Sequence, residues 1–380
     1  MLSAFRPISA ILLAAVCLFL FLPAQSGAAE YVFRAEDADG IGEGWRLFLE
    51  ALPADAEELA GTDLSDPAGA AETVRSALDP EKAADKLKNA VLSAAETVIP
   101  AASPLIGLVL LCAAARYAVP SGAMGEGMGR ITRLAACVTV FRLTADALAL
   151  AKRASSAVCR LAELLVPVAE GICLFGGGVS EARVTRVGLM LAATAVEEAA
   201  GRVLIPASGI VLGLCAVSGG KGPAWQTAGA LRRLLLRIWQ TLAVGMSFLL
   251  GAQSILSRSA DSAGLRLSRF ALSSFIPVAG SALSEAWSSI SAGIRALRGA
   301  AGIGGILCMA AAALPAVIPL LLWQAVFALA QSAAEVLELK ELSALLGEAG
   351  GIVGLLSAFC LYALAMFTVE LALFAGIGGG

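Results

Sequence analysis

From residue 99 onward, the chain is a series of long apolar segments separated by short charged stretches. The 36 residues between Arg298 and Glu335 contain no Asp, Glu, Lys or Arg. A helix that crosses a bilayer needs about 20 apolar residues, so this run alone exceeds one crossing. The pattern predicts membrane-spanning helices rather than the core of a soluble domain.

Five uncharged segments are long enough to be spanning helices. They are residues 99–115, 203–220, 238–257, 299–334 and 349–369. Two weaker segments, 134–151 and 161–179, carry internal charges, and the serine-rich stretch 258–298 shares this ambiguity. Each of these three is either a crossing or an interfacial amphipathic helix. The predicted fold is an all-α, polytopic integral membrane helix bundle with five to eight spans, six or seven being favoured.

Prolines and glycines within the apolar runs predict helix breaks or close helix contacts. The run 299–334 is too long for one straight crossing and contains two prolines, so we expect a kinked helix or two half-helices buried in protein. The glycine cluster at 302–305 indicates a tight turn or a close helix contact. The candidate helix breaks and packing points are Pro277, Gly302, Gly304, Gly305, Pro315 and Pro319.

The first 98 residues have a different character. Residues 1–29 have the features of a secretory signal peptide, namely Arg6, an apolar stretch of about 15 residues and small residues up to Ala29. We expect cleavage near Ala28 or Ala29, with an uncleaved anchor helix as the alternative. Residues 30–98 hold 16 acidic and 6 basic side chains and are predicted to form a small extracytoplasmic helical region. One helix should begin at Asp79-Pro80, and residues 99–380 should form the polytopic membrane domain.

Basic residues predict the orientation of the spans. With residues 30–98 outside, the first span runs inward, and the stretch after it carries Arg116, Arg130 and Arg133. Cytoplasmic loops are enriched in Lys and Arg, which agrees with this direction. A second basic loop is expected to be cytoplasmic for the same reason, and it contains Lys221, Arg232, Arg233 and Arg237.

Composition excludes several classes of function. The chain is 58% hydrophobic and 15% charged, and it contains no histidine. The absence of histidine removes every Ser-His-Asp or Cys-His arrangement and the commonest zinc ligand. The eight cysteines form no C-x-x-C pair, which supports neither a disulfide framework nor a metal site. No P-loop, dinucleotide-binding or nucleophile-elbow motif occurs, so we expect no enzyme activity, catalytic residue, cofactor or metal.

A few ionisable residues lie within or beside apolar segments. Such groups are costly in a bilayer and usually face a partner or a water-filled path. The candidates are Asp146, Glu163, Glu170, Glu197, Glu198 and Glu370. One interpretation is ion coupling or a polar conduit, and the other is the polar face of an interfacial helix. The second is favoured for all except Glu370, which lies in the apolar run 352–377.

One stretch resembles a known family. Residues 269–286 read RFALSSFIPVAGSALSEA, and residues 295–307 continue with a glycine-rich run that is followed by Pro315. This segment is similar to a signature of the stage III sporulation protein AE family. The order of signal-like N-terminus, modest extracytoplasmic region and polytopic membrane domain also resembles that family. The resemblance extends over nearly the whole chain, although only residues 269–319 are specific.

The resemblance implies a role in endospore formation. Family members are expected in the mother-cell membrane around the forespore, as multi-pass proteins of a complex with a secretion-type ATPase, other membrane proteins and ring-forming proteins. That complex is thought to act as a channel, and no catalytic residues are established for this member. The resemblance therefore implies a non-enzymatic membrane subunit that binds protein partners and lipid but no nucleic acid. The alternative is a self-sufficient, ion-coupled secondary transporter that uses the buried carboxylates and proline-containing helices.

Overall fold

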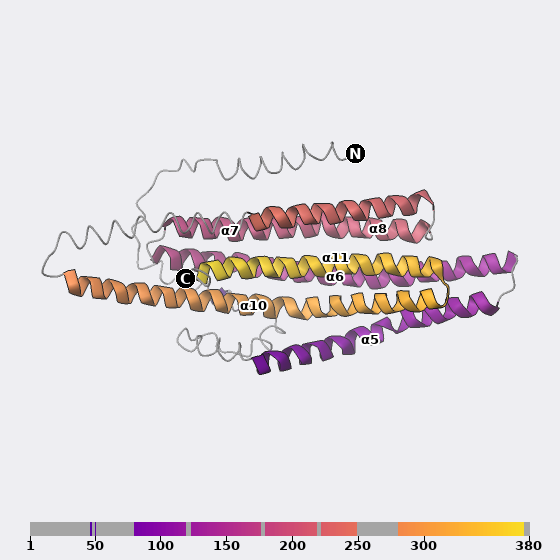
Figure 1. Ribbon diagram of the computed structural model, residues 1–380, viewed down its shortest axis with the longest axis horizontal. Helices are drawn as coiled ribbons and strands as arrows, with labels where there is room; N and C mark the ends of the chain where they lie inside the picture. The colour runs from indigo at the N-terminus through magenta and orange to yellow at the C-terminus, as the bar shows by residue number, and fades with distance from the viewer. Residues whose placement is uncertain are drawn as a thin grey trace.

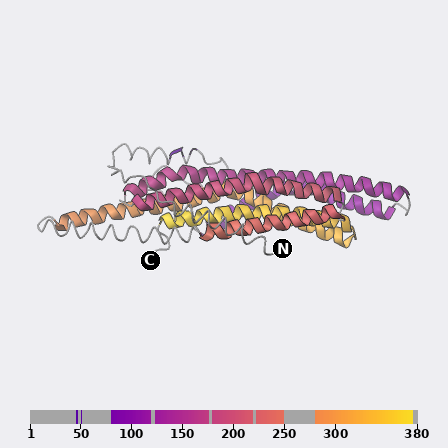
Figure 2. The ribbon, with the colours of Figure 1, turned by 90° about the horizontal axis from the view of Figure 1, so that it is seen from above.

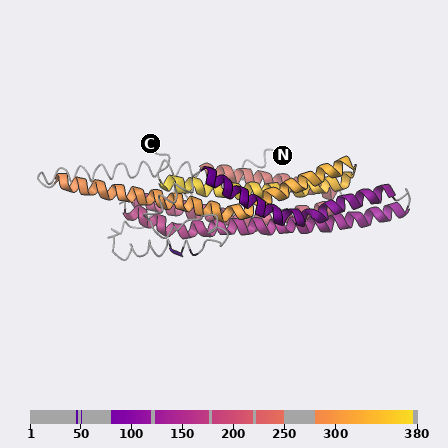
Figure 3. The same cartoon turned by 90° about the horizontal axis from the view of Figure 1, so that it is seen from below.

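The computed structural model describes residues 46, 47, 50, 80–118, 123–175, 179–218, 222–248 and 280–375. Over these ranges every regular element is a helix and no strand occurs, which confirms the predicted all-α class. The long helices lie side by side along one axis of an elongated bundle (Figures 1, 2 and 3). The predicted signal peptide 1–29, most of residues 30–98 and Pro277 lie outside the described residues.

The described helices follow one another in chain order. They are α5 (Pro80–Ala118), α6 (Ala123–Phe175), α7 (Val179–Glu198), the π-helix η1 (Ala199–Leu204), α8 (Ile205–Ser218), α10 (Gly280–Val336) and α11 (Lys340–Ala375), and residues 223–248 form a further helix between α8 and α10. The predicted helix start at Asp79-Pro80 is confirmed, since α5 begins at Pro80. Proline suits a first helical turn because its φ is preset and its missing N–H would have no intrahelical partner there.

Five described helices are long and apolar enough to cross a membrane. They are Lys88–Tyr117, Leu134–Phe175, Ala182–Ser218, Ala301–Val336 and Lys340–Ala375. The shortest has 30 residues, or about 45 Å at 1.5 Å per residue. Each is therefore longer than the hydrocarbon core of about 30 Å and must tilt or project beyond it. A total of six or seven spans stays a prediction.

The structure lacks two helix breaks that the sequence pattern allowed, one between residues 151 and 161 and one in residues 299–334, for which a kinked helix was the other expectation. Residues 134–151 and 161–179 were predicted as separate segments, but α6 runs from Ala123 to Phe175 through Pro167 without a break. The charges between these segments lie on exposed positions of the helix, so they interrupt the apolar pattern but not the backbone. Likewise, α10 is one α-helix through Pro315 and Pro319 rather than two half-helices. Neighbouring helices make such prolines tolerable in membrane helices.

The basic residues after Lys221 also lie elsewhere than predicted. Arg232, Arg233 and Arg237 belong to the helix 223–248 and not to a loop. The predicted span 238–257 overlaps this helix as far as residue 248, and its remainder lies outside the described residues. The sequence pattern did not predict a helix at these arginines, because three charges within six positions interrupt an otherwise apolar segment.

Three pairs of consecutive helices have their adjoining ends at one end of the bundle (Figure 1). The pairs are α5 and α6, α8 and helix 223–248, and α10 and α11. At this end Arg116 of α5 donates hydrogen bonds to the backbone carbonyl and the carboxylate of Glu338, in the turn after α10. Arg116, one of the basic residues predicted to be cytoplasmic, therefore lies at this end of the molecule.

The last helix is the common packing partner of the others. α11 makes its most extensive contact with α10 and also packs on α6, α7 and α8. Its buried residues recur from Leu342 to Phe374. Two buried hydroxyls are satisfied within their own helices: Thr144 donates to the Val140 carbonyl at 2.7 Å and Ser357 to the Val353 carbonyl at 2.9 Å. Local bonds of this kind let polar residues enter a core that offers no water.

Candidate functional site

The four candidate intramembrane polar residues do not converge on one site. Asp146 and Glu163 are exposed on α6. Glu170, near the end of α6, is half-buried and accepts two hydrogen bonds from Arg186 of α7 at 3.2 and 3.3 Å. Glu370 of α11 is only 6% exposed, and its Oε1 atom has no hydrogen-bond partner. Glu370 is thus the single candidate that the structure places inside the bundle.

Gly302 and Gly305 of α10 lie at close contacts with neighbouring helices. A Cβ atom added to Gly302 would lie 2.6 Å from the Ala375 Cβ and 2.9 Å from the Leu371 carbonyl oxygen of α11. At Gly305 it would lie 3.0 Å from Leu165 of α6 and 3.1 Å from Leu371. Gly304 is buried, whereas Pro315 and Pro319 are half-buried. The cluster therefore belongs to the junction of three helices and not to a turn.

The other end of α11 makes the same kind of close contact, but there the glycines belong to α11 and the facing side chains to α10. Gly347, Gly350 and Gly354 lie against Gln331, Phe327 and Gln324 of α10, each with a side-chain atom within 3.1 Å of an added Cβ. Small residues at such positions allow membrane helices to approach closely and to gain van der Waals contact along the backbone. The α10–α11 hairpin is therefore held by glycines of α10 near one end and of α11 near the other.

A partly buried ion pair joins helix 223–248 to α11. One guanidinium nitrogen of Arg232 lies 3.1 Å from both carboxylate oxygens of Glu348, and these side chains are 34% and 17% exposed. The same guanidinium covers Gly351, where an added Cβ would lie 2.7 Å from it. Glycine at 351 thus makes room for the arginine, and the pair sets the register between two helices that are far apart in the sequence.

Aromatic contacts extend this interface. The Trp239 ring lies 4.9 Å from the Phe359 ring and 5.0 Å from the Tyr362 ring, the second in an edge-on arrangement. The Tyr362 hydroxyl donates a 2.6 Å hydrogen bond to the Ala243 carbonyl. Edge-on aromatic pairs are favourable beyond their buried area. Helix 223–248 is therefore fixed on α11 along three to four turns.

The π-helix η1 forms a wide turn between α7 and α8, and it lines the same pocket as Trp239 and Phe359. The Ile205 N–H bonds to the Ala200 carbonyl, a spacing of five residues instead of four. Pro206 follows at once, and its ring lacks an N–H and would crowd the carbonyl four residues earlier in a regular α-helix. A wide turn at this position relieves that conflict, and π-turns of this kind often accompany functional sites. Such a turn also displaces the side chains after it around the helix.

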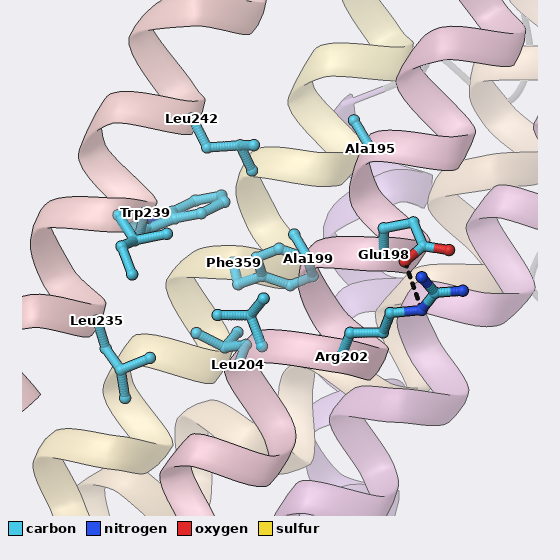
Figure 4. Close-up of a pocket in the computed structure, with 11 residues that line it drawn as sticks. Ala195, Glu198, Ala199, Arg202, Leu204, Leu235, Trp239, Leu242 and Phe359 are labelled. Carbon is cyan, nitrogen blue, oxygen red and sulfur yellow. Dashed lines mark ion pairs between the residues drawn. The ribbon is translucent and has the colours of Figure 1, made fainter. Parts of the chain in front are cut away.

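A pocket of about 330 Å³ lies beside η1. It is lined by residues of α7, η1, helix 223–248 and α11, and Figure 4 shows Trp239 and Leu242 on one wall, facing Ala199 and Leu204, with Phe359 between them. The lining includes one charged pair, in which the Arg202 Nε lies 2.7 Å from a Glu198 carboxylate oxygen. That pair lies at one margin, away from Trp239 (Figure 4). The pocket therefore suits an apolar occupant with a polar end.

Apart from Glu198, the pocket residues were missed at the sequence level. Leu235, Trp239 and Phe359 read as ordinary apolar positions of separate segments, and nothing local shows that they meet. One signal was available: Glu198 and Arg202 are four residues apart, just before Pro206 in an apolar run. A proline after a charged pair within one helix marks a place where the backbone must deviate and where a polar margin accompanies the deviation.

The comparisons with known proteins give one match. The model of the family described as stage III sporulation protein AE matches residues 72–378 of the chain. No curated protein and no solved structure matches it. The match includes η1, the pocket, the Arg232–Glu348 pair and the α10–α11 hairpin.

Proposed function

The chain belongs to the stage III sporulation protein AE family, and on this premise we propose that it is a non-enzymatic membrane subunit of a channel or secretion complex between mother cell and forespore. The observation that carries the proposal is the family match over residues 72–378. Five helices long and apolar enough to cross a membrane among the described residues support a membrane location. The proposed location is the mother-cell membrane around the forespore, with residues 30–98 on the extracytoplasmic side.

The proposed contribution of this subunit is a rigid helical platform. The glycine contacts between α10 and α11 and the Arg232–Glu348 pair support this role, because they fix helices from distant parts of the chain. The dispersed carboxylates support a structural role better than a catalytic one, since no two of the four candidates lie together. Its proposed partners are ring-forming proteins, other membrane proteins and a secretion-type ATPase of the same complex.

Co-purification tests this function. A tagged chain extracted from sporulating cells in a mild detergent should bring the ATPase and ring-forming subunits with it, because a subunit of a complex stays with its neighbours. The bound proteins would be identified by mass spectrometry. An unrelated tagged polytopic protein from the same cells is the control. Recovery of the chain alone, at the same tag yield, would contradict the proposal.

One observation favours a second function, an ion-coupled secondary transporter. Glu370 is a buried carboxylate in a candidate span, and its Oε1 lacks a hydrogen-bond partner. Carboxylates in such places often bind the coupling ion of a transporter. A transporter would act alone, whereas a complex subunit needs its partners.

Under this second function, Glu370→Gln should abolish ion-gradient-driven uptake by the purified chain in liposomes, because glutamine keeps the shape but not the ionisable group. Glu163→Gln is the matched control, since Glu163 is exposed on α6, and uptake should be unchanged. Radiolabelled or fluorescent solutes would report the uptake. Absence of gradient-dependent uptake by the wild-type chain alone would remove the transporter function and leave the complex subunit.

A further inference from the structure

The pocket beside η1 opens on the outside of the bundle. Val203 and Ile238, which line it, keep 38% and 44% of their surface exposed. One of its walls belongs to the candidate span Ala182–Ser218, so the opening is accessible to lipid in a membrane. An apolar cavity left empty forfeits dispersion contacts. A hydrocarbon chain restores these contacts without taking any polar group out of water.

Positive charge accompanies this opening. The Arg202 side chain is 79% exposed, although it pairs with Glu198, which is itself 46% exposed. Arg233 and Arg237 of helix 223–248 are also exposed but do not line the pocket, whose lining has Arg202 as its one basic residue. A guanidinium binds phosphate through paired N–H groups and does so more strongly than most neutral donors. Basic pockets between membrane helices are known sites for anionic lipid headgroups.

We propose that this pocket binds one anionic phospholipid, with an acyl chain between Leu242, Ala199 and Phe359 and with the phosphate on Arg202. Its volume of about 330 Å³ lies at the small end of ligand pockets, about 300–1,000 Å³, so it takes one chain and leaves the rest of the lipid outside. Arg202 exchanges the carboxylate of Glu198 for the lipid phosphate. The wide turn of η1 keeps the wall open to this chain. This proposal does not depend on the channel function.

Fluorescence of Trp239 tests the proposal in the full chain. Trp45, Trp225, Trp287 and Trp323 would be replaced by Phe, and the purified protein placed in phosphatidylcholine liposomes. Increasing fractions of phosphatidylglycerol brominated on its acyl chains would then be added, because bromine quenches tryptophan only in contact. Trp239 lines the pocket, so we expect quenching at low fractions of the anionic lipid. Brominated phosphatidylcholine should need about tenfold more, because its choline group neutralises the phosphate charge that Arg202 attracts, a difference similar to one charge-assisted hydrogen bond.

Variants separate the pocket from the surrounding lipid. Ala199→Phe fills the pocket and should abolish the high-affinity quenching, and Ala195→Phe does so from the other end if the first variant fails to fold. Arg202→Gln should remove the preference for the anionic lipid. Arg186→Gln should retain it, since Arg186 is also an exposed arginine paired with a carboxylate, at 3.2 Å from Glu170, but does not line the pocket.

A second reporter measures ordinary lipid contact. Phe248→Trp, in a chain without other tryptophans, places the reporter on a residue that is 61% exposed. Its quenching should be the same for both lipids and in all variants. The proposal is overturned if Trp239 behaves like this reporter, because its contact is then with bulk lipid. It is equally overturned if Trp239 is not quenched at all, because protein then closes the pocket.

Discussion

Gly302→Ala should destabilise the folded bundle by about 1–3 kcal/mol, the usual cost of inserting a methyl group into a packed site. The added Cβ would lie 2.6 Å from the Ala375 Cβ and 2.9 Å from a backbone oxygen of α11. Backbone atoms of a packed helix cannot rotate away as the end of a long side chain can. α10 and α11 must therefore separate along their most extensive contact, and Gly302→Leu should prevent stable folding.

Gly299→Ala is the matched control for this prediction. Gly299 is one turn earlier on the same helix, and nothing lies within 4 Å of an added Cβ there. Alanine is favoured over glycine in a helix by up to about 1 kcal/mol, so this variant should be as stable as the wild type or more stable. Thermal unfolding in detergent can be followed with a thiol-reactive dye, because Cys308 and Cys360 are buried and free. Equal melting temperatures for the two variants would refute the close contact at residue 302.

Glu348→Ala should cost about 3 kcal/mol of folding stability, within the range for breaking a buried ion pair. The substitution leaves the Arg232 guanidinium against α11 without its carboxylate, while neither side chain is more than 34% exposed. Glu338→Ala is the control, because its pair with Arg116 is 3.1 Å long but 47% and 70% exposed. Exposed pairs contribute about 0–1 kcal/mol, so this variant should melt near the wild type.

A double variant distinguishes the ion pair from mere packing. Arg232→Met with Glu348→Leu replaces the pair by apolar side chains of similar length, which is often neutral or stabilising. It should therefore recover most of the stability that Glu348→Ala loses. The same dye-based melting experiment measures the double variant and its two single variants, Arg232→Met and Glu348→Leu. A double variant as unstable as the sum of two single variants would show that the charges are not coupled.

Much of the bundle could be predicted from the sequence. Uncharged runs of sufficient length gave the helices around residues 99–115, 299–334 and 349–369, and Asp79-Pro80 gave the start of α5. The continuity of α6 could not be predicted in this way, because charges at 152, 153 and 160 interrupt the apolar pattern while they lie on exposed helix positions. The sequence shows that these residues are charged, but it does not show that they lie on the exposed side of the helix.

The candidate site was less accessible to prediction. Glu370 stood out because its surroundings in the chain are apolar, and the structure buries it. Arg232 and Glu348 are 116 residues apart, so no local pattern could connect them, and Arg232 was assigned to a loop. The pocket depends on the turn at η1 and on the rings of Trp239 and Phe359, which come from two different helices. Such a site exists only after the helices have packed.

The central position of α11 also has a consequence for biosynthesis. The helix that contacts α6, α7, α8 and α10 is the last described one to be translated. Until the ribosome has completed the C-terminal part, the earlier helices lack α11 as a packing partner. The faces that pack on α11 stay uncovered during this time. A premature stop before Lys340 would leave every earlier helix pair without its shared neighbour, and such nascent chains would be natural substrates for membrane quality control.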